Sequence, residues 1–123
     1  MIVTKARGIA RFYHATRYTI KGIRAAYSGE PAFRYEVWAA AVLAPLAFRV
    51  AQSGLQLSLL LSSLLLVLIM ELINTAIEAV VDRAGTEFNT LAGLAKDLGS
   101  AAVFMALIIA LLIWGGILWD NLV

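Results

Sequence analysis

Polar side chains recur along one face of an otherwise apolar segment in the middle of the chain: Glu71, Asn74, Thr75, Glu78 and Asp82. At about 100° per residue, these five side chains fall within roughly 60° of one direction and spread over about 16 Å of helix. A carboxylate in an apolar medium is costly, so this face must meet protein, water, a cation or a ligand. We call these five residues the polar stripe, and the stripe predicts a functional site.

Charged residues next to the neighbouring apolar runs indicate what that site could bind. Lys96 and Asp97 precede the last apolar run, and Glu30, Arg34 and Glu36 precede or open the first. Carboxylates in line repel one another unless a divalent cation neutralises them, and magnesium prefers such oxygens. A magnesium-bound nucleotide needs carboxylates for its metal, cations for its phosphates and a base for the acceptor hydroxyl. No Walker A or protein-kinase glycine loop is present, so the residues alone predict a cation and anion site.

The composition indicates that these groups lie in or beside a membrane. Hydrophobic residues make up 62% of the chain and the mean hydropathy is +0.86, which exceeds what a soluble domain of 123 residues could bury. The length suits one domain, spanning 1–123. There is no cysteine, which excludes disulfides, thiolate zinc sites and a cysteine nucleophile.

Three apolar stretches, at about 33–51, 55–81 and 98–119, predict three transmembrane helices. The first contains Pro45, which predicts a kink. The second exceeds the roughly 20 residues that span a bilayer, so part of it should tilt or project. Only 52–54 separates the first two stretches, which predicts a tight reversal, whereas 84–97 reads as a longer polar connection. We therefore expect an all-α integral membrane protein.

The first 30 residues read as a cationic arm. Seven of the ten basic residues precede the first long apolar run, without the apolar core that a signal peptide would need. Apolar residues recur in steps of four and three, with cations opposite, which predicts an amphipathic helix lying on anionic head groups. The aromatic and aliphatic face disfavours nucleic acid as the partner.

The cations also predict orientation. The arm, Arg83 and Lys96 fall on one side of the membrane and only Arg49 on the other. The N-terminus and the 84–97 connection should therefore be cytoplasmic, and the C-terminus should lie on the opposite side. Trp114 and Trp119, near the C-terminus, suit interfacial anchoring.

Other protein classes also place carboxylates in membrane helices. A proton-linked transporter would usually show more spans or inverted repeats than this chain does. A non-enzymatic scaffold could use the polar stripe to hold helices together. Lys96 could be a snorkelling anchor, and Asp97 the N-cap of the third membrane helix.

Two motifs carry a resemblance to a known family. The runs Glu71-Leu-Ile-Asn74-Thr75-Ala-Ile-Glu78-Ala-Val-Val-Asp82-Arg83 and Ala95-Lys96-Asp97-Leu-Gly99-Ser100-Ala-Ala resemble the signature of prokaryotic diacylglycerol kinases. The similarity extends through Lys21 to Ala26 and Glu30 to Glu36, so it covers nearly the whole chain. It implies a homotrimer in the bacterial inner membrane, with three membrane helices and an amphipathic surface helix per subunit, a cytoplasmic N-terminus and a periplasmic C-terminus. The implied reaction is ATP- and Mg²⁺-dependent phosphorylation of diacylglycerol to phosphatidic acid. Related Gram-positive members prefer undecaprenol, which is the alternative acceptor.

The resemblance also implies roles for individual residues. Glu71 matches the general base and Asn74 a second catalytic residue, while Glu30 and Glu78 match the metal ligands. The nucleotide contacts that match are Arg11, Tyr18, Glu30, Glu78, Glu87, Lys96 and Asp97. The lipid-substrate contacts that match are Arg11, Thr16, Thr19, Arg24, Tyr27, Phe33, Arg34, Glu36, Glu71, Ser100, Trp114 and Trp119. The chain departs from the best-known members at Ile20 and Tyr27, where they have tryptophan, and at Asn89, where they have histidine.

A site shared between subunits is a further expectation. Three helices, one of them short, can hardly surround the polar stripe and also admit a nucleotide and a lipid. The arm could reach across a neighbouring subunit and present Arg11 or Tyr18 there.

Overall fold

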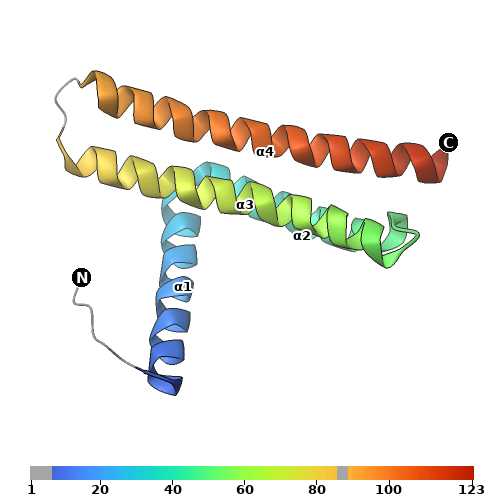
Figure 1. The fold of residues 1–123 in the computed structure, drawn as a ribbon, viewed down its shortest axis with the longest axis horizontal. Helices are drawn as coiled ribbons and strands as arrows, with labels where there is room; N and C mark the ends of the chain where they lie inside the picture. The colour runs from blue at the N-terminus through green and yellow to red at the C-terminus, as the bar shows by residue number, and fades with distance from the viewer. Residues whose placement is uncertain (1–6, 86–88) are drawn as a thin grey trace.

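The computed structural model describes residues 7–85 and 89–123. Within the described residues the structure contains only helices: α1 (Ile9–Gly29), α2 (Pro31–Val50), α3 (Gly54–Arg83) and α4 (Thr90–Leu122). Helices α2, α3 and α4 run side by side, and α1 projects sideways from them (Figure 1). We call the end of the bundle that holds the α2–α3 turn and the C-terminus the turn end. The opposite end, where α3 leads to α4, is the loop end (Figure 1). The expectation of an all-helical fold with an N-terminal helical arm is confirmed.

Two helices of the described chain are long and apolar enough to cross a membrane. They are α3, with 30 residues, and α4, with 33 residues, whose most apolar 18-residue windows have mean hydropathies of 2.2 and 2.6. Only 22% and 17% of their apolar windows are buried, which is expected where lipid replaces water as the solvent. The expected first span, α2, carries Arg34, Glu36 and Arg49 and is not among the two.

The joint between α1 and α2 is closed by an arginine. Glu30 interrupts the helix in an extended conformation, and Pro31 opens α2, where its missing N–H is not needed. Arg34 Nη1 donates to the carbonyl oxygens of Tyr27 at 2.8 Å and Ser28 at 3.0 Å. These carbonyls end α1, where a cation also meets the negative end of the helix dipole. Arg34 therefore fixes the direction in which α1 leaves the bundle.

The turn between α2 and α3 confirms the predicted tight reversal at 52–54. Ser53 caps α3, and its Oγ accepts a hydrogen bond from Gln56 N at 3.1 Å. Asn121 Nδ2, near the end of α4, donates to Val50 O and to Gln56 Oε1, both at 2.8 Å. The turn end is thus tied together by hydrogen bonds from three helices.

The prediction of a polar connection over 84–97 is wrong for its second half. Helix α4 begins at Thr90, because Asn89 Oδ1 accepts from Leu91 N at 2.9 Å and Ala92 N at 3.2 Å and so caps it. Asp97 lies about two turns inside the helix, so it is not the N-cap. The charges of Lys96 and Asp97 mark the edge of the apolar run, whereas the helix itself starts earlier.

A small core holds the turn end. Its buried apolar side chains are Ala47, Leu60, Trp114 and Ile117. Trp114 is 9% exposed, and its Nε1 donates to Ser63 Oγ at 3.0 Å. Interfacial anchoring is therefore the wrong interpretation of Trp114, since its ring packs among helices. Trp119 is 68% exposed and can still contact lipid.

Candidate active site

The polar stripe of α3 faces other helices at its inner end and becomes exposed towards the loop end. Glu71 is 5% exposed and Asn74 is 9% exposed, whereas Asp82 is open to solvent. The opposite face of α3 presents apolar side chains such as Ile73 and Val80. Both faces agree with the sequence argument that the carboxylates avoid lipid.

Carboxyl groups from several elements meet at the buried end of the stripe. Glu36, on α2, lies beside Glu71, and the charges of Glu30 and Glu78 also act on Glu71. Glu36 Oε2 is buried and has no hydrogen-bond partner among the described residues. Glu36 was expected among the lipid contacts, and its position beside Glu71 was not predicted. The spacing along the chain carries no signal for that pairing, because it depends on how α2 packs on α3.

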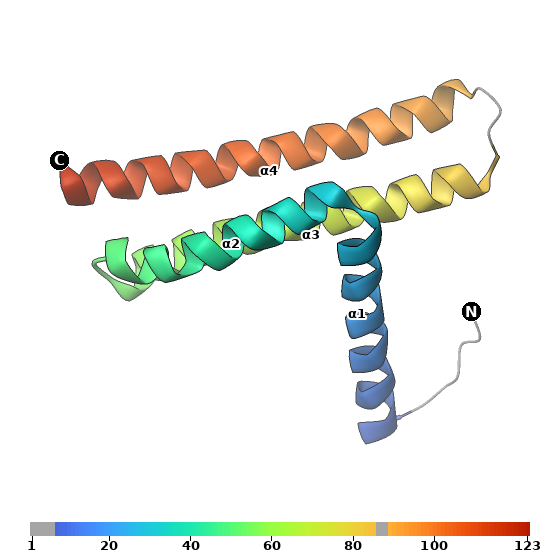
Figure 2. The same cartoon turned by 180° about the vertical axis from the view of Figure 1, so that it is seen from behind.

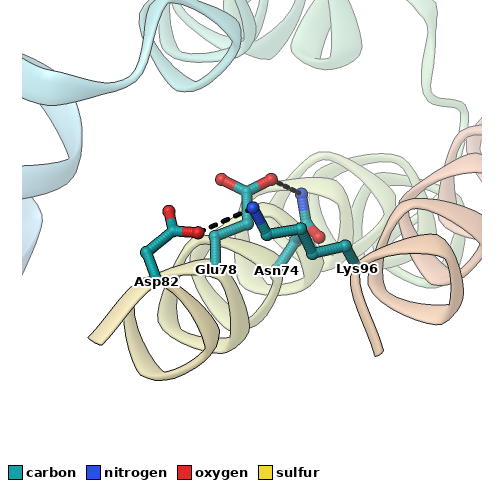
Figure 3. A network of polar contacts seen from close by, with 4 residues as sticks. All are labelled: Asn74, Glu78, Asp82 and Lys96. Carbon is teal, nitrogen blue, oxygen red and sulfur yellow. Dashed lines mark hydrogen bonds and ion pairs between the residues drawn. The ribbon is translucent and has the colours of Figure 1, made fainter. Parts of the chain in front are cut away.

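A second group of polar contacts joins α3 to α4 (Figure 3). Lys96, on α4, reaches over α3, and its Nζ lies 2.7 Å from Asp82 Oδ1. Asn74 Nδ2 donates a long hydrogen bond of 3.4 Å to Glu78 Oε1. The side chains of Lys96 and Asp82 are 43% and 65% exposed, so water screens their ion pair and it contributes little to stability. A pair of this strength leaves Lys96 free to bind an anion.

Grooves border this site on three sides. One of about 500 Å³ lies between α1 and α3 and brings Tyr18 and Glu30 to Thr75 and Ala79. A second of about 400 Å³, at the loop end, is lined by Asp82 and Lys96 among others. The third, of about 450 Å³, is almost wholly apolar. Glu36 lies on the lining of this apolar groove, together with Leu43, Leu64, Val67, Leu111 and Trp114.

Several predicted contacts on α1 lie apart from the stripe in this subunit. Arg11 belongs to the first turn of α1, and Figure 2 shows that this end of the helix points away from the bundle. The hydroxyl groups of Thr16 and Thr19 donate to carbonyls of their own helix, each at 2.9 Å. Arg24 and Tyr27 are exposed.

The remaining predicted contacts differ in their accessibility. Phe33 is 3% exposed, which leaves little surface for a lipid. Arg34 is engaged with the end of α1, as described above. Asp97 and Ser100 are exposed on α4. Glu87 lies outside the described residues.

The metal ligands expected from the sequence do not form a closed cage. Within the described residues, no three or more acidic or histidine side chains are arranged to hold a metal ion. Glu30 and Glu78 nevertheless lie on different elements around Glu71. Magnesium commonly takes one or two protein carboxylates and completes its shell with phosphate oxygens and water. Glu30 and Glu78 would together supply the protein part of such a shell.

The amino-acid sequence matches a known protein family over most of its length. The family model described as prokaryotic diacylglycerol kinase matches residues 17–118, which is most of the chain. The chain belongs to the prokaryotic diacylglycerol kinase family. The matched part of this family member includes Tyr18, Glu71, Lys96 and Trp114 but not Arg11.

Individual relatives in the family are similar over nearly their whole length. The diacylglycerol kinase of Haemophilus influenzae is 45% identical over 115 residues, covering 94% of this chain and 98% of the relative. That of Pseudomonas aeruginosa is 45% identical over 111 residues, covering 90% of each chain. That of Helicobacter pylori strain 26695 is 42% identical over 111 residues, covering 90% of this chain and 87% of the relative.

Proposed function

We propose that this chain is a membrane lipid kinase that transfers the terminal phosphoryl group of ATP to the hydroxyl of diacylglycerol, forming phosphatidic acid. One observation carries the proposal. The buried Glu71 carboxyl lies beside Glu36, which lines an apolar groove, and Glu71 belongs to the polar stripe, whose other end is exposed at the loop end. A lipid hydroxyl approaching from the groove and a phosphate approaching from the loop end would meet there. The names of the relatives favour diacylglycerol as the acceptor.

Glu71 acts as the general base. It takes the proton of the lipid hydroxyl as that oxygen attacks the terminal phosphorus, while the bond from phosphorus to the bridging oxygen of ADP breaks. The neighbouring Glu36 carboxyl borders Glu71 on the side of the apolar groove. Asn74, one turn further along α3, orients Glu78 through its amide.

The loop end receives the nucleotide. Lys96, together with Arg11, provides positive charge for the phosphates, and Tyr18, Glu87 and Asp97 complete the nucleotide contacts. Glu30 and Glu78 would hold a magnesium ion that arrives with ATP. When bound, that ion neutralises charge on the phosphates.

The apolar groove lined by Glu36 and Trp114 takes an acyl chain of the acceptor. Its lining of alanine, leucine, valine and tryptophan side chains supports this assignment. The head-group side of the acceptor meets residues of α1, the α1–α2 joint and α4. These residues are Arg11, Thr16, Thr19, Arg24, Tyr27, Arg34 and Ser100, with Trp119 contacting lipid at the turn end.

The functional unit is a homotrimer in the bacterial inner membrane with active sites shared between subunits. In it, α2, α3 and α4 all cross the membrane, α1 lies on the cytoplasmic surface and the C-terminus is periplasmic. Two observations support the sharing. The N-terminal end of α1, with Arg11, points away from its own bundle (Figure 2), and the apolar faces of α3 and α4 are largely exposed. A neighbouring subunit would bring Arg11 to the polar stripe.

The deciding experiment is an assay of the purified protein in detergent with labelled ATP, magnesium and a choice of lipid alcohol. We expect labelled phosphatidic acid from diacylglycerol and much less product from undecaprenol. A strong preference for undecaprenol would mean that the acceptor is undecaprenol and that the reaction is still phosphoryl transfer from ATP to a lipid alcohol. Absence of any labelled lipid, with ion uptake into proteoliposomes instead, would favour the transporter alternative.

A further inference from the structure

Gly99 differs from the other glycines of this chain in what surrounds it. A Cβ atom added at Gly99 would overlap Asn74 Oδ1 and would lie 3.4 Å from Asn74 Cγ and 3.5 Å from Ile77 Cδ1. At each of the other eight glycines an added Cβ would meet no heavy atom within 4 Å. Gly99 is also buried, on the face of α4 that packs against α3. The missing side chain is therefore what lets α4 approach α3 at Asn74.

This close approach limits where the Asn74 amide can lie. On one side, Nδ2 donates to Glu78 Oε1. On the other, Oδ1 lies against Gly99, is buried, and has no hydrogen-bond partner among the described residues. Buried polar atoms usually find a partner, so an unpaired amide oxygen is unfavourable unless packing holds the side chain in place. The backbone of α4 at Gly99 supplies that packing.

Gly99 also lies three residues after Lys96 on α4, which puts both on the same face of the helix. Lys96 reaches Asp82, and Gly99 meets Asn74, eight residues earlier on α3. The two contacts therefore set how α4 lies along the polar stripe.

We infer that Gly99 is a positioning residue for phosphoryl transfer. Its lack of a side chain lets α4 hold the Asn74 amide against the Glu78 carboxylate, and a methyl group there would push that amide away. The inference rests on the proposed function, since it assigns Gly99 to the same site. It predicts an effect on turnover that passes through Asn74 and is larger than any effect on nucleotide binding.

The test compares Gly99→Ala with Gly115→Ala, which adds the same methyl group on the same helix where space is open. We expect Gly99→Ala to lower kcat about tenfold or more with little change in the KM for ATP, and Gly115→Ala to retain wild-type turnover. Alanine has a higher helix propensity than glycine, so a lower helix propensity would not account for the decrease in kcat. Wild-type turnover in Gly99→Ala would overturn the inference. A wild-type protein without lipid kinase activity would instead overturn the proposed function.

A double-mutant cycle separates positioning from simple helix packing. Asn74→Ser shortens the side chain and makes room for the methyl group. Gly99→Ala should therefore change kcat less than about twofold in that background, if the two residues act as a unit. An equal fold decrease in kcat in both backgrounds would show that Gly99 acts without Asn74.

Nuclear magnetic resonance gives a readout that needs no turnover. The side-chain amide signals of Asn74 are identified as those that are absent from Asn74→Ser. These signals should shift in Gly99→Ala and stay in place in Gly115→Ala. Unshifted Asn74 signals in Gly99→Ala would also overturn the inference.

Discussion

The two ends of the bundle use buried polar groups in different ways. At the turn end the groups are paired: Trp114 donates to Ser63 and Ser63 to the carbonyl of Leu60 at 2.7 Å, while Asn121 bonds Gln56 and Val50. Towards the loop end, Glu36 Oε2 and Asn74 Oδ1 are buried without a partner among the described residues. The same helices, α2 and α3, contribute to both sets.

This difference separates stability from chemistry. A satisfied buried hydrogen bond stabilises the fold modestly and has no capacity left for a ligand. A buried group without a partner destabilises the fold and persists where function requires it. Substitutions of the paired groups at the turn end should therefore lower stability and leave activity intact. Substitutions of the polar groups towards the loop end should lower activity and leave stability intact.

The largest expected effect is that of Glu71→Gln. The amide keeps the size of the carboxyl but cannot take a proton, so kcat should fall by roughly 100-fold or more. The KM for ATP and the thermal unfolding temperature in detergent should change little. Steady-state kinetics and a melting curve check both expectations. Near-normal turnover would remove Glu71 from the role of base.

Mixed oligomers test whether the loop end is completed by a neighbour. Arg11→Ala and Glu71→Gln subunits, each inactive alone, would be unfolded, mixed and reconstituted, with cross-linking to confirm mixed trimers. Some sites would then contain both wild-type residues, and lipid phosphorylation should reappear. Confirmed mixed oligomers that stay inactive would place these two residues in one subunit.

A smaller effect is expected on the metal requirement. Glu78→Gln or Glu30→Gln removes one hard oxygen ligand, so half-maximal activity should need several-fold more magnesium. Asp120→Asn removes a carboxylate at the turn end and serves as the matched control. Magnesium titrations that are unchanged in both glutamine variants would exclude these residues as ligands.

The turn end should respond in the opposite way. Ser63→Ala leaves the buried Trp114 N–H without its acceptor, which should destabilise the protein by about 1–3 kcal/mol. The kcat should remain that of the wild type below the new unfolding temperature. A loss of turnover without a loss of stability would mean that the paired groups of the turn end also take part in catalysis.

The helical periodicity was sufficient to predict the polar stripe, since Glu71 and Asn74 needed only a helix to share a face. The turn at 52–54 was equally local. The start of α4 was missed because charge at Lys96 and Asp97 outweighed the capping signal of Asn89. The pairing of Glu36 with Glu71, the engagement of Arg34 with α1 and the packing of Gly99 on Asn74 depend on how helices approach one another. One sequence carries no direct signal for such contacts.

The smallest expected effect concerns Asp82, the exposed partner of Lys96. Because Asp82 competes with the nucleotide phosphates for Lys96, Asp82→Asn should lower the KM for ATP. An exposed ion pair is weak, which limits the change in KM to about fivefold at most. The effect should shrink as salt is raised, because ions screen exposed charges. Asp120→Asn again controls for the loss of one negative charge and should leave the KM unchanged. A higher KM in Asp82→Asn would mean that Asp82 assists nucleotide binding, so that the whole stripe, including its exposed end, belongs to the site.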